Sequence, residues 1–145
     1  MMISSLFYCP HYCYNSFMNN KVLLAVNGTL MRGLELENNL KEVNASFIKE
    51  SKTENAYRLY SINDRYPAMI KDEKGACIDV EVYELTNEAM QVVLSKEPEG
   101  LTIKKIRLID GQEVYGVVGL PSIIKDGKEI TSYGGWRNYI KELKK

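Results

Sequence analysis

Glu81 is the first residue whose type and spacing could do chemistry. The segment 77–85 alternates between apolar and mixed side chains, so Asp79, Glu81 and Tyr83 share one face of a predicted strand. A carboxylate on the inward face of a curled sheet could transfer protons in a pocket, with Tyr83 beside the substrate. On the wet face of a half-buried strand it would be an ordinary solvated charge. Both interpretations of Glu81 stay open.

A second candidate is the segment Asn27-Gly28-Thr29, which follows the continuous apolar run 22–26. Such a run is typical of a strand buried on both faces. The three residues after it form either an ordinary turn that ends the strand or a loop that binds a ligand.

Arg32 and Arg137 could bind a substrate carboxylate, because a guanidinium matches the two oxygens of a carboxylate with two parallel N–H bonds. The alternative is that both are surface charges, as most arginines are.

The segment from Cys9 to Cys13 places three possible zinc ligands, Cys9, His11 and Cys13, within five residues. A structural zinc site needs a fourth ligand, and the remaining cysteine, Cys77, stands alone on a predicted strand. We therefore expect no metal site, and we expect residues 1–17 to be a poorly ordered leader that lies upstream of the true start or is dispensable.

Composition excludes several classes of protein. Nineteen Lys and Arg residues balance nineteen Asp and Glu residues, so no net field attracts nucleic acid or an anionic membrane. No apolar run approaches the ~20 residues of a membrane-spanning helix. Three cysteines in 145 residues do not make a secreted disulfide framework. The sequence predicts a soluble cytoplasmic protein without nucleic-acid or membrane partners and without a cofactor.

The pattern of short elements favours one α+β domain over residues 18–145, with a curled or closed sheet and two or three short helices. The expected elements are a strand at 22–26, a helix at 34–43, a hairpin of 45–50 with 57–62, a strand at 77–85, a helix at 87–94 capped by Thr86 or Asn87, a hairpin of 103–109 with 114–118 around a two-residue Asp110-Gly111 turn, and a helix at 136–143. Pro67 is expected to end strand pairing.

Four segments resemble the γ-glutamylcyclotransferase-like superfamily. They are Val26-Asn27-Gly28-Thr29-Leu30, the Tyr57-Arg58-Leu59-Tyr60 and Tyr66-Pro67-Ala68-Met69 pair, the run from Gly75 to Tyr83, and the run from Ile130 to Tyr139. The last is similar to the closing motif of the allophanate hydrolase C-terminal domain and is the most specific, since it contains two glycines and the only tryptophan. The resemblance covers residues 21–143 and implies a small mixed β-barrel.

Two departures from these families bear on activity. Active γ-glutamylcyclotransferases begin the loop with a tyrosine, where this chain has Asn27. The allophanate hydrolase domain carries a histidine in or beside the loop, where this chain has Thr29 and Leu30. The sole histidine, His11, lies outside the resemblance, so a decarboxylation that depends on that histidine does not carry over.

The resemblance also implies a catalytic glutamate within residues 97–101, after the helix that follows the central strand. Alignment on the Glu-Gly step selects Glu99, and alignment on the Glu-Pro-x-Gly-Leu pattern selects Glu97. In the superfamily's reaction the substrate's α-amine attacks its own γ-carbonyl, and one carboxylate can take the amine's proton and protonate the leaving nitrogen. Backbone N–H groups from Gly28 to Leu30 could hold the oxyanion. The alternative is that both glutamates are solvated charges beside a proline.

Two hypotheses of function follow. The first is a small-molecule enzyme that acts on a γ-glutamyl or ureido/amide compound by carboxylate acid/base catalysis. The second is a non-catalytic accessory module, related to the allophanate hydrolase C-terminal domain, that binds a metabolite or an amidase subunit. Retention of Glu97 and Glu99 favours the first, and the missing loop tyrosine and histidine favour the second.

Overall fold

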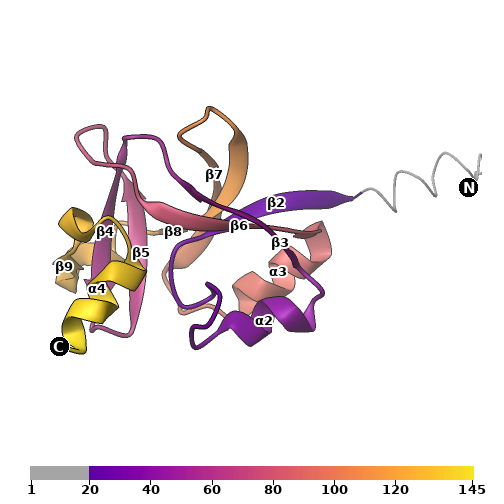
Figure 1. Cartoon of the computed structure of the whole chain (residues 1–145), viewed down its shortest axis with the longest axis horizontal. Coiled ribbons are helices and arrows are strands. Elements are labelled where there is room, and N and C mark those ends of the chain that lie inside the picture. The colour runs from indigo at the N-terminus through magenta and orange to yellow at the C-terminus, as the bar shows by residue number, and fades with distance from the viewer. Residues whose placement is uncertain (1–19) are drawn as a thin grey trace, which may run out of the picture.

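The computed structural model describes residues 20–145, which form an α+β domain of two sheets and three α-helices (Figure 1). The five-stranded sheet has the order β3 (Ser46–Lys52), β6 (Asp79–Thr86), β2 (Lys21–Val26), β8 (Glu113–Gly119) and β7 (Leu101–Arg107). The three-stranded sheet has the order β5 (Tyr66–Lys71), β4 (Tyr57–Ile62) and β9 (Lys128–Glu129). The helices are α2 (Glu37–Glu42), α3 (Asn87–Ser95) and α4 (Trp136–Leu143), and two 3-10 turns cover Ile123–Asp126 and Thr131–Tyr133.

Strand β2 lies in the middle of the larger sheet. It pairs antiparallel with β6 and parallel with β8, so this sheet is mixed. Leu24, Ala25 and Val26 point to alternate faces, yet all are at most 1% exposed. Burial on both faces explains why the run is continuously apolar, as the sequence indicated.

The larger sheet curls until its two edge strands meet at one end. Just beyond β3 and β7, Thr53 and Leu108 form an isolated antiparallel bridge. Two backbone hydrogen bonds flank it, from Ile109 to Lys52 at 2.9 Å and from Glu54 to Arg107 at 2.9 Å. Pairing goes no further within the described residues, so the sheet is curled without closing into the barrel that the family resemblance implied.

The predicted hairpin of residues 45–50 with 57–62 is wrong. Strand β3 pairs with β6, and β4 pairs with β5 and β9. Strand β3 lies at the edge of the larger sheet, where β6 pairs with it along its length. The polar stretch after β3 therefore connects the larger sheet to the smaller one and does not form a hairpin turn.

The expectation that Pro67 ends strand pairing is also wrong. Pro67 lies within β5 and opposes Ser61 of β4. Strand β5 is an edge strand, so the missing N–H of proline leaves no gap in a second ladder.

The helices follow the sequence signals. Thr86 caps α3, its Oγ1 accepting a hydrogen bond from Ala89 N at 3.0 Å. Helices α2 and α3 lie side by side (Figure 1), with Lys96 Nζ 3.1 Å from Glu42 Oε1. Helix α4 covers the smaller sheet and buries Trp136 and Tyr139.

The second predicted hairpin is confirmed as β7 with β8, with a loop of three residues rather than two. Gly111 N donates to Leu108 O and Leu108 N donates to Gln112 O, which encloses residues 109–111. Gly111 takes the left-handed conformation at φ 90°, as in a type I turn with a bulge.

In the described part of the chain, no helix is long and apolar enough to cross a membrane. The leader 1–17 with Cys9, His11 and Cys13 lies outside the described residues, and its interpretation stays a prediction.

Candidate functional site

Glu97 lies in a narrow slot beside the loop that follows β2. The slot has a volume of about 10 Å³, which is room for roughly one water. Its lining includes Asn27, Gly28, Thr29 and Leu30 from the loop, Tyr66 and Pro67 from β5, Glu97 from the segment after α3, Leu101 from β7 and Val117 from β8. The fold thus brings one of the two candidate glutamates to the loop from distant parts of the sequence.

The Glu97 carboxyl group is poised to exchange a proton. Its Oε2 atom is buried and has no hydrogen-bond partner among the described residues. Burial raises the pKa of Glu97 from its ordinary value near 4.5 to about 7, because the charged form loses water without gaining a partner. Near neutral pH the group is therefore present in both protonation states, which suits a general acid/base.

The loop after β2 contributes Gly28, Thr29 and Leu30 to the lining of the slot. Within residues 20–145, the backbone amides of Gly28, Thr29 and Leu30 donate to no backbone carbonyl, while Met31 N donates to Gly28 O at 3.0 Å. Backbone amides without an acceptor, in residues that line a slot, could stabilise a negative oxygen.

Asn27 and Gly28 fix the start of this loop. Asn27 is 4% exposed, and its Nδ2 donates to Val117 O at 2.9 Å. A Cβ atom on Gly28 would lie 2.5 Å from Pro67 Cδ, so only glycine allows the loop to approach β5 this closely. Asn27 is thus a core anchor that ties β2 to β8, while its neighbours form the wall of the slot.

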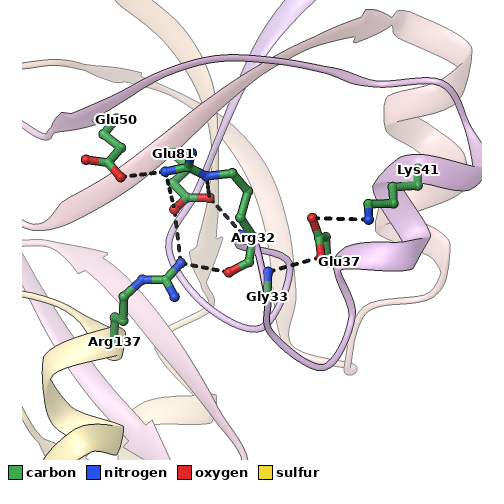
Figure 2. Close-up of polar contacts among 7 residues, drawn as sticks. All are labelled: Arg32, Gly33, Glu37, Lys41, Glu50, Glu81 and Arg137. Carbon is green, nitrogen blue, oxygen red and sulfur yellow. Dashed lines mark hydrogen bonds and ion pairs between the residues drawn. The ribbon is translucent and has the colours of Figure 1, made fainter.

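Glu81 is buried, and its carboxylate lies between two arginines (Figure 2). Oε2 lies 3.0 Å from a terminal nitrogen of Arg137, and Oε1 lies 3.5 Å from Arg32 Nε. Oε1 also accepts a hydrogen bond from the backbone N of Arg32 at 2.9 Å. The interpretation of Glu81 as a solvated surface charge is wrong, since this face of β6 is covered by the loop and by α4.

This cluster holds the end of the site loop. Arg137 donates to the carbonyl oxygen of Arg32 at 3.0 Å, and Gly33 N donates to Glu37 Oε1 at 3.0 Å (Figure 2). Arg32 also pairs with Glu50 at 2.5 Å. The carboxylate that Arg32 and Arg137 bind in this structure is therefore the protein's own, and the cluster positions the loop that lines the slot.

An open hollow of about 490 Å³ lies beside this cluster, but the charges on its wall are paired. Arg137 pairs with Glu81, Lys52 with Asp79, and Glu50 with Arg32.

Two other candidates lie away from the slot. The Glu99 side chain is exposed and does not line the slot. Tyr83 is 5% exposed and packs edge-on against Phe47, with ring centroids 5.6 Å apart. The contribution of Tyr66 and Pro67 to the slot wall was not apparent from sequence, because it depends on where β5 packs.

Comparison with known proteins places this chain in a family. Residues 22–141 match the profile of the allophanate hydrolase C-terminal domain. The urea amidolyase of Saccharomyces cerevisiae is 32% identical over 135 residues, covering 88% of this chain. The chain spans only 7% of the length of that enzyme.

Solved structures show the same fold in stand-alone and fused proteins. A uropathogenic E. coli-specific protein is 47% identical, with a TM-score of 0.82 over 83% of this chain and 96% of that one. The Kluyveromyces lactis allophanate hydrolase is 28% identical, with a TM-score of 0.80 over 86% of this chain and 22% of that one. An AIG2-like protein from Mus musculus shares the fold, with 18% identity and a TM-score of 0.56 over 74% and 84% of the two chains.

Proposed function

Because this chain belongs to the allophanate hydrolase C-terminal domain family, we propose that it is a small-molecule enzyme in which Glu97 transfers protons for a γ-glutamyl or ureido/amide substrate. One observation carries the proposal: the buried, unpartnered Oε2 of Glu97 lies in a slot walled by loop residues 27–30. Family membership alone supports the fold, and the chemistry is argued from this site.

For a γ-glutamyl substrate, the proposed reaction is an intramolecular acyl transfer. The substrate's amine attacks its own carbonyl carbon, and Glu97 in its ionised form takes the proton that the amine loses. A tetrahedral intermediate then carries its negative oxygen against the free amides of Gly28, Thr29 and Leu30. The protonated Glu97 returns the proton to the leaving nitrogen, which departs as a neutral amine.

The test uses a panel of γ-glutamyl amino acids and measures the release of 5-oxoproline. Glu97→Gln keeps the shape of the side chain but cannot take a proton, so we expect turnover to fall by about 10²–10⁴-fold. Glu99→Gln is the matched control, because the Glu99 side chain is exposed two residues away, and its turnover should match wild type. Equal loss in both variants, or loss in neither, would contradict the assignment of Glu97.

A second candidate function is an accessory module that binds a metabolite or an amidase, and Asn27 favours it. The Asn27 side chain is engaged in the core, so the first position of the loop offers no free group to orient a substrate. The chain also spans only 7% and 22% of the two longer enzymes that it resembles. No turnover across the panel, together with saturable binding to a purified amidase of the same cell, would favour this function over catalysis.

A further inference from the structure

The slot at Glu97 is too small for a substrate, so most of a bound molecule must lie outside it. A second hollow of about 310 Å³ adjoins the slot and shares Thr29 and Tyr66 with it. Pro98, which follows Glu97 directly, lies in its wall. A ligand that placed one reactive group in the slot would therefore place its remaining atoms in this hollow.

Arg65 also lines this second hollow. It also lines a third hollow of about 360 Å³, which shares Thr29, Glu35 and Arg65 with the second. The loop after β2 and the turn between β4 and β5 thus line two adjoining hollows beside the Glu97 slot, and Arg65 lines both. These two hollows are together called the groove.

Arg65 differs from every other arginine of the chain. Arg32 and Arg137 pair with Glu81, Arg58 pairs with Asp72 and Glu129, and Arg107 pairs with Glu113. Among the described residues, no carboxylate pairs with Arg65, and its side chain donates to no other residue. Its fork of N–H donors is therefore available to a ligand.

The turn that carries Arg65 is rigid. Asn63 and Asp64 both take the left-handed conformation, at φ 57° and 58°, and Arg65 N donates to Ile62 O at 3.0 Å. The Asp64 carboxylate accepts hydrogen bonds from Tyr139 Oη at 2.5 Å and from Ser61 Oγ at 2.7 Å. The backbone of Arg65 is thus held before a ligand arrives, which lowers the entropic cost of binding.

We propose that Arg65 binds the carboxylate of the substrate, so that the substrates are small amides or ureides that carry a carboxylate. This inference rests on the proposed function of Glu97. A guanidinium binds a carboxylate through two parallel hydrogen bonds, which fixes both the position and the orientation of the ligand. Because Glu35 and Asp64 line the same groove and balance the charges of Arg65 and Lys144, a monoanion or a zwitterion fits better than a dianion.

The experiment compares charged ligands with uncharged isosteres of the same shape. Glu97→Gln protein, which retains the groove without turnover, is titrated with γ-glutamylglycine and with its diamide, and with ureidoacetate and ureidoacetamide. Binding is measured by calorimetry and by amide chemical shifts of residues 27–36 and 62–66. The same titrations are repeated with Arg65→Gln, Arg65→Lys and the control Arg107→Gln added to that background.

We expect at least one acid to bind about 10- to 100-fold more tightly than its amide, as for a hydrogen bond to a charged group. Arg65→Gln should abolish this preference, and Arg65→Lys should keep part of it, since a lysine keeps the charge but not the fork. Arg107→Gln should keep all of it, because Arg107 lies on β7 outside the groove.

Failure of this inference differs from failure of the proposed function. If an acid and its amide bind equally, or Arg65→Gln leaves the preference intact, the role of Arg65 is refuted even where Glu97→Gln abolishes turnover. If the preference depends on Arg65 but wild type turns over no probe, the carboxylate site stands and the catalytic role of Glu97 falls. If no probe binds wild type or Glu97→Gln protein, both proposals fall.

Discussion

Arg137 reaches from the last helix to within 3.0 Å of the buried carboxylate of Glu81. The same nitrogen donates to the carbonyl of Arg32, so one side chain ties α4 to strand β6 and to the loop after β2 (Figure 2). The segment from Ile130 to Tyr139, which carries the most specific family resemblance, therefore holds the loop that lines the Glu97 slot.

Glu81→Gln should destabilise the protein while leaving its chemistry in place. The amide oxygen can still accept from Arg32 N, but the two charge-assisted bonds are lost, so the free energy of unfolding should fall by about 1–3 kcal/mol. Urea denaturation measures the change. Arg107→Gln is the control, because its pair with Glu113 is exposed and should be worth less than about 1 kcal/mol. Complete loss of 5-oxoproline release in a folded Glu81→Gln protein would contradict this expectation and would show that turnover depends on the Glu81 cluster.

Gly28→Ala should close the slot at Glu97. The added methyl group would lie 2.5 Å from Pro67 Cδ and 2.6 Å from Pro67 Cγ, so β5 or the loop must move. We expect a loss of about 1–3 kcal/mol in stability and loss of turnover. Gly33→Ala is the control, because Gly33 has a positive φ of 77° but open space around it. Its cost, about 1–2 kcal/mol of backbone strain, should leave the slot open. Wild-type turnover in Gly28→Ala would show that the slot is not the reaction site.

The positions of most strands and helices could be predicted from the sequence, because they depend on local patterns. The apolar run 22–26, the cap at Thr86 and the hairpin of β7 with β8 each follow from periodicity or from one residue type. Which strands pair with each other was harder to predict. Strand β3 pairs with β6, which comes later in the chain than β4. Such pairing depends on tertiary packing and not on the local sequence pattern.

Only the part of the site that lies in one short segment of sequence could be predicted. The loop 27–30 was visible as a glycine-containing break after a buried strand. The choice of Glu97 over Glu99 as the slot residue required coordinates, since the two are separated by one proline and differ only in which of them faces the slot. The pairing of Glu81 with Arg32 and Arg137 spans 49 and 56 residues, and no local pattern encodes it.

Thr53→Val should open the end of the curled sheet. Thr53 is fully buried, and its Oγ1 accepts from Ile78 N at 2.9 Å and donates to Glu54 O at 2.9 Å. Valine keeps the shape but leaves a buried N–H without a partner, which costs about 1–3 kcal/mol. Thr53→Ser keeps the hydroxyl group and should lose less. Faster hydrogen exchange at Ile78 and Ile109 in Thr53→Val would locate the effect, and equal stability of the two variants would contradict it.

The raised pKa of Glu97 should make the free energy of unfolding depend on pH, and Glu97→Gln should remove this contribution. Because the pKa of Glu97 is raised to about 7 in the folded protein, the native state keeps a proton that the unfolded chain releases near pH 4.5. Stability that comes from this group is therefore present at low pH and is lost as the pH rises from about 4.5 to 7. Each unit of pKa is about 1.4 kcal/mol, and partial exposure of the side chain reduces the full effect to about 2–3 kcal/mol.

Glu97→Gln removes this titration without changing the size of the side chain. The variant should match wild type at pH 4, where Glu97 is protonated in the folded protein, and should be about 2–3 kcal/mol more stable at pH 8. Urea denaturation at pH 4, 6 and 8 measures the difference, and subtraction of the two curves cancels the titration of every other group that the substitution leaves unchanged. Glu99→Gln should follow wild type throughout, because its carboxylate is exposed. A Glu97→Gln curve parallel to wild type would mean that Glu97 titrates as an ordinary carboxylate, and the slot would then lack the neutral-pH acid that its proposed chemistry requires.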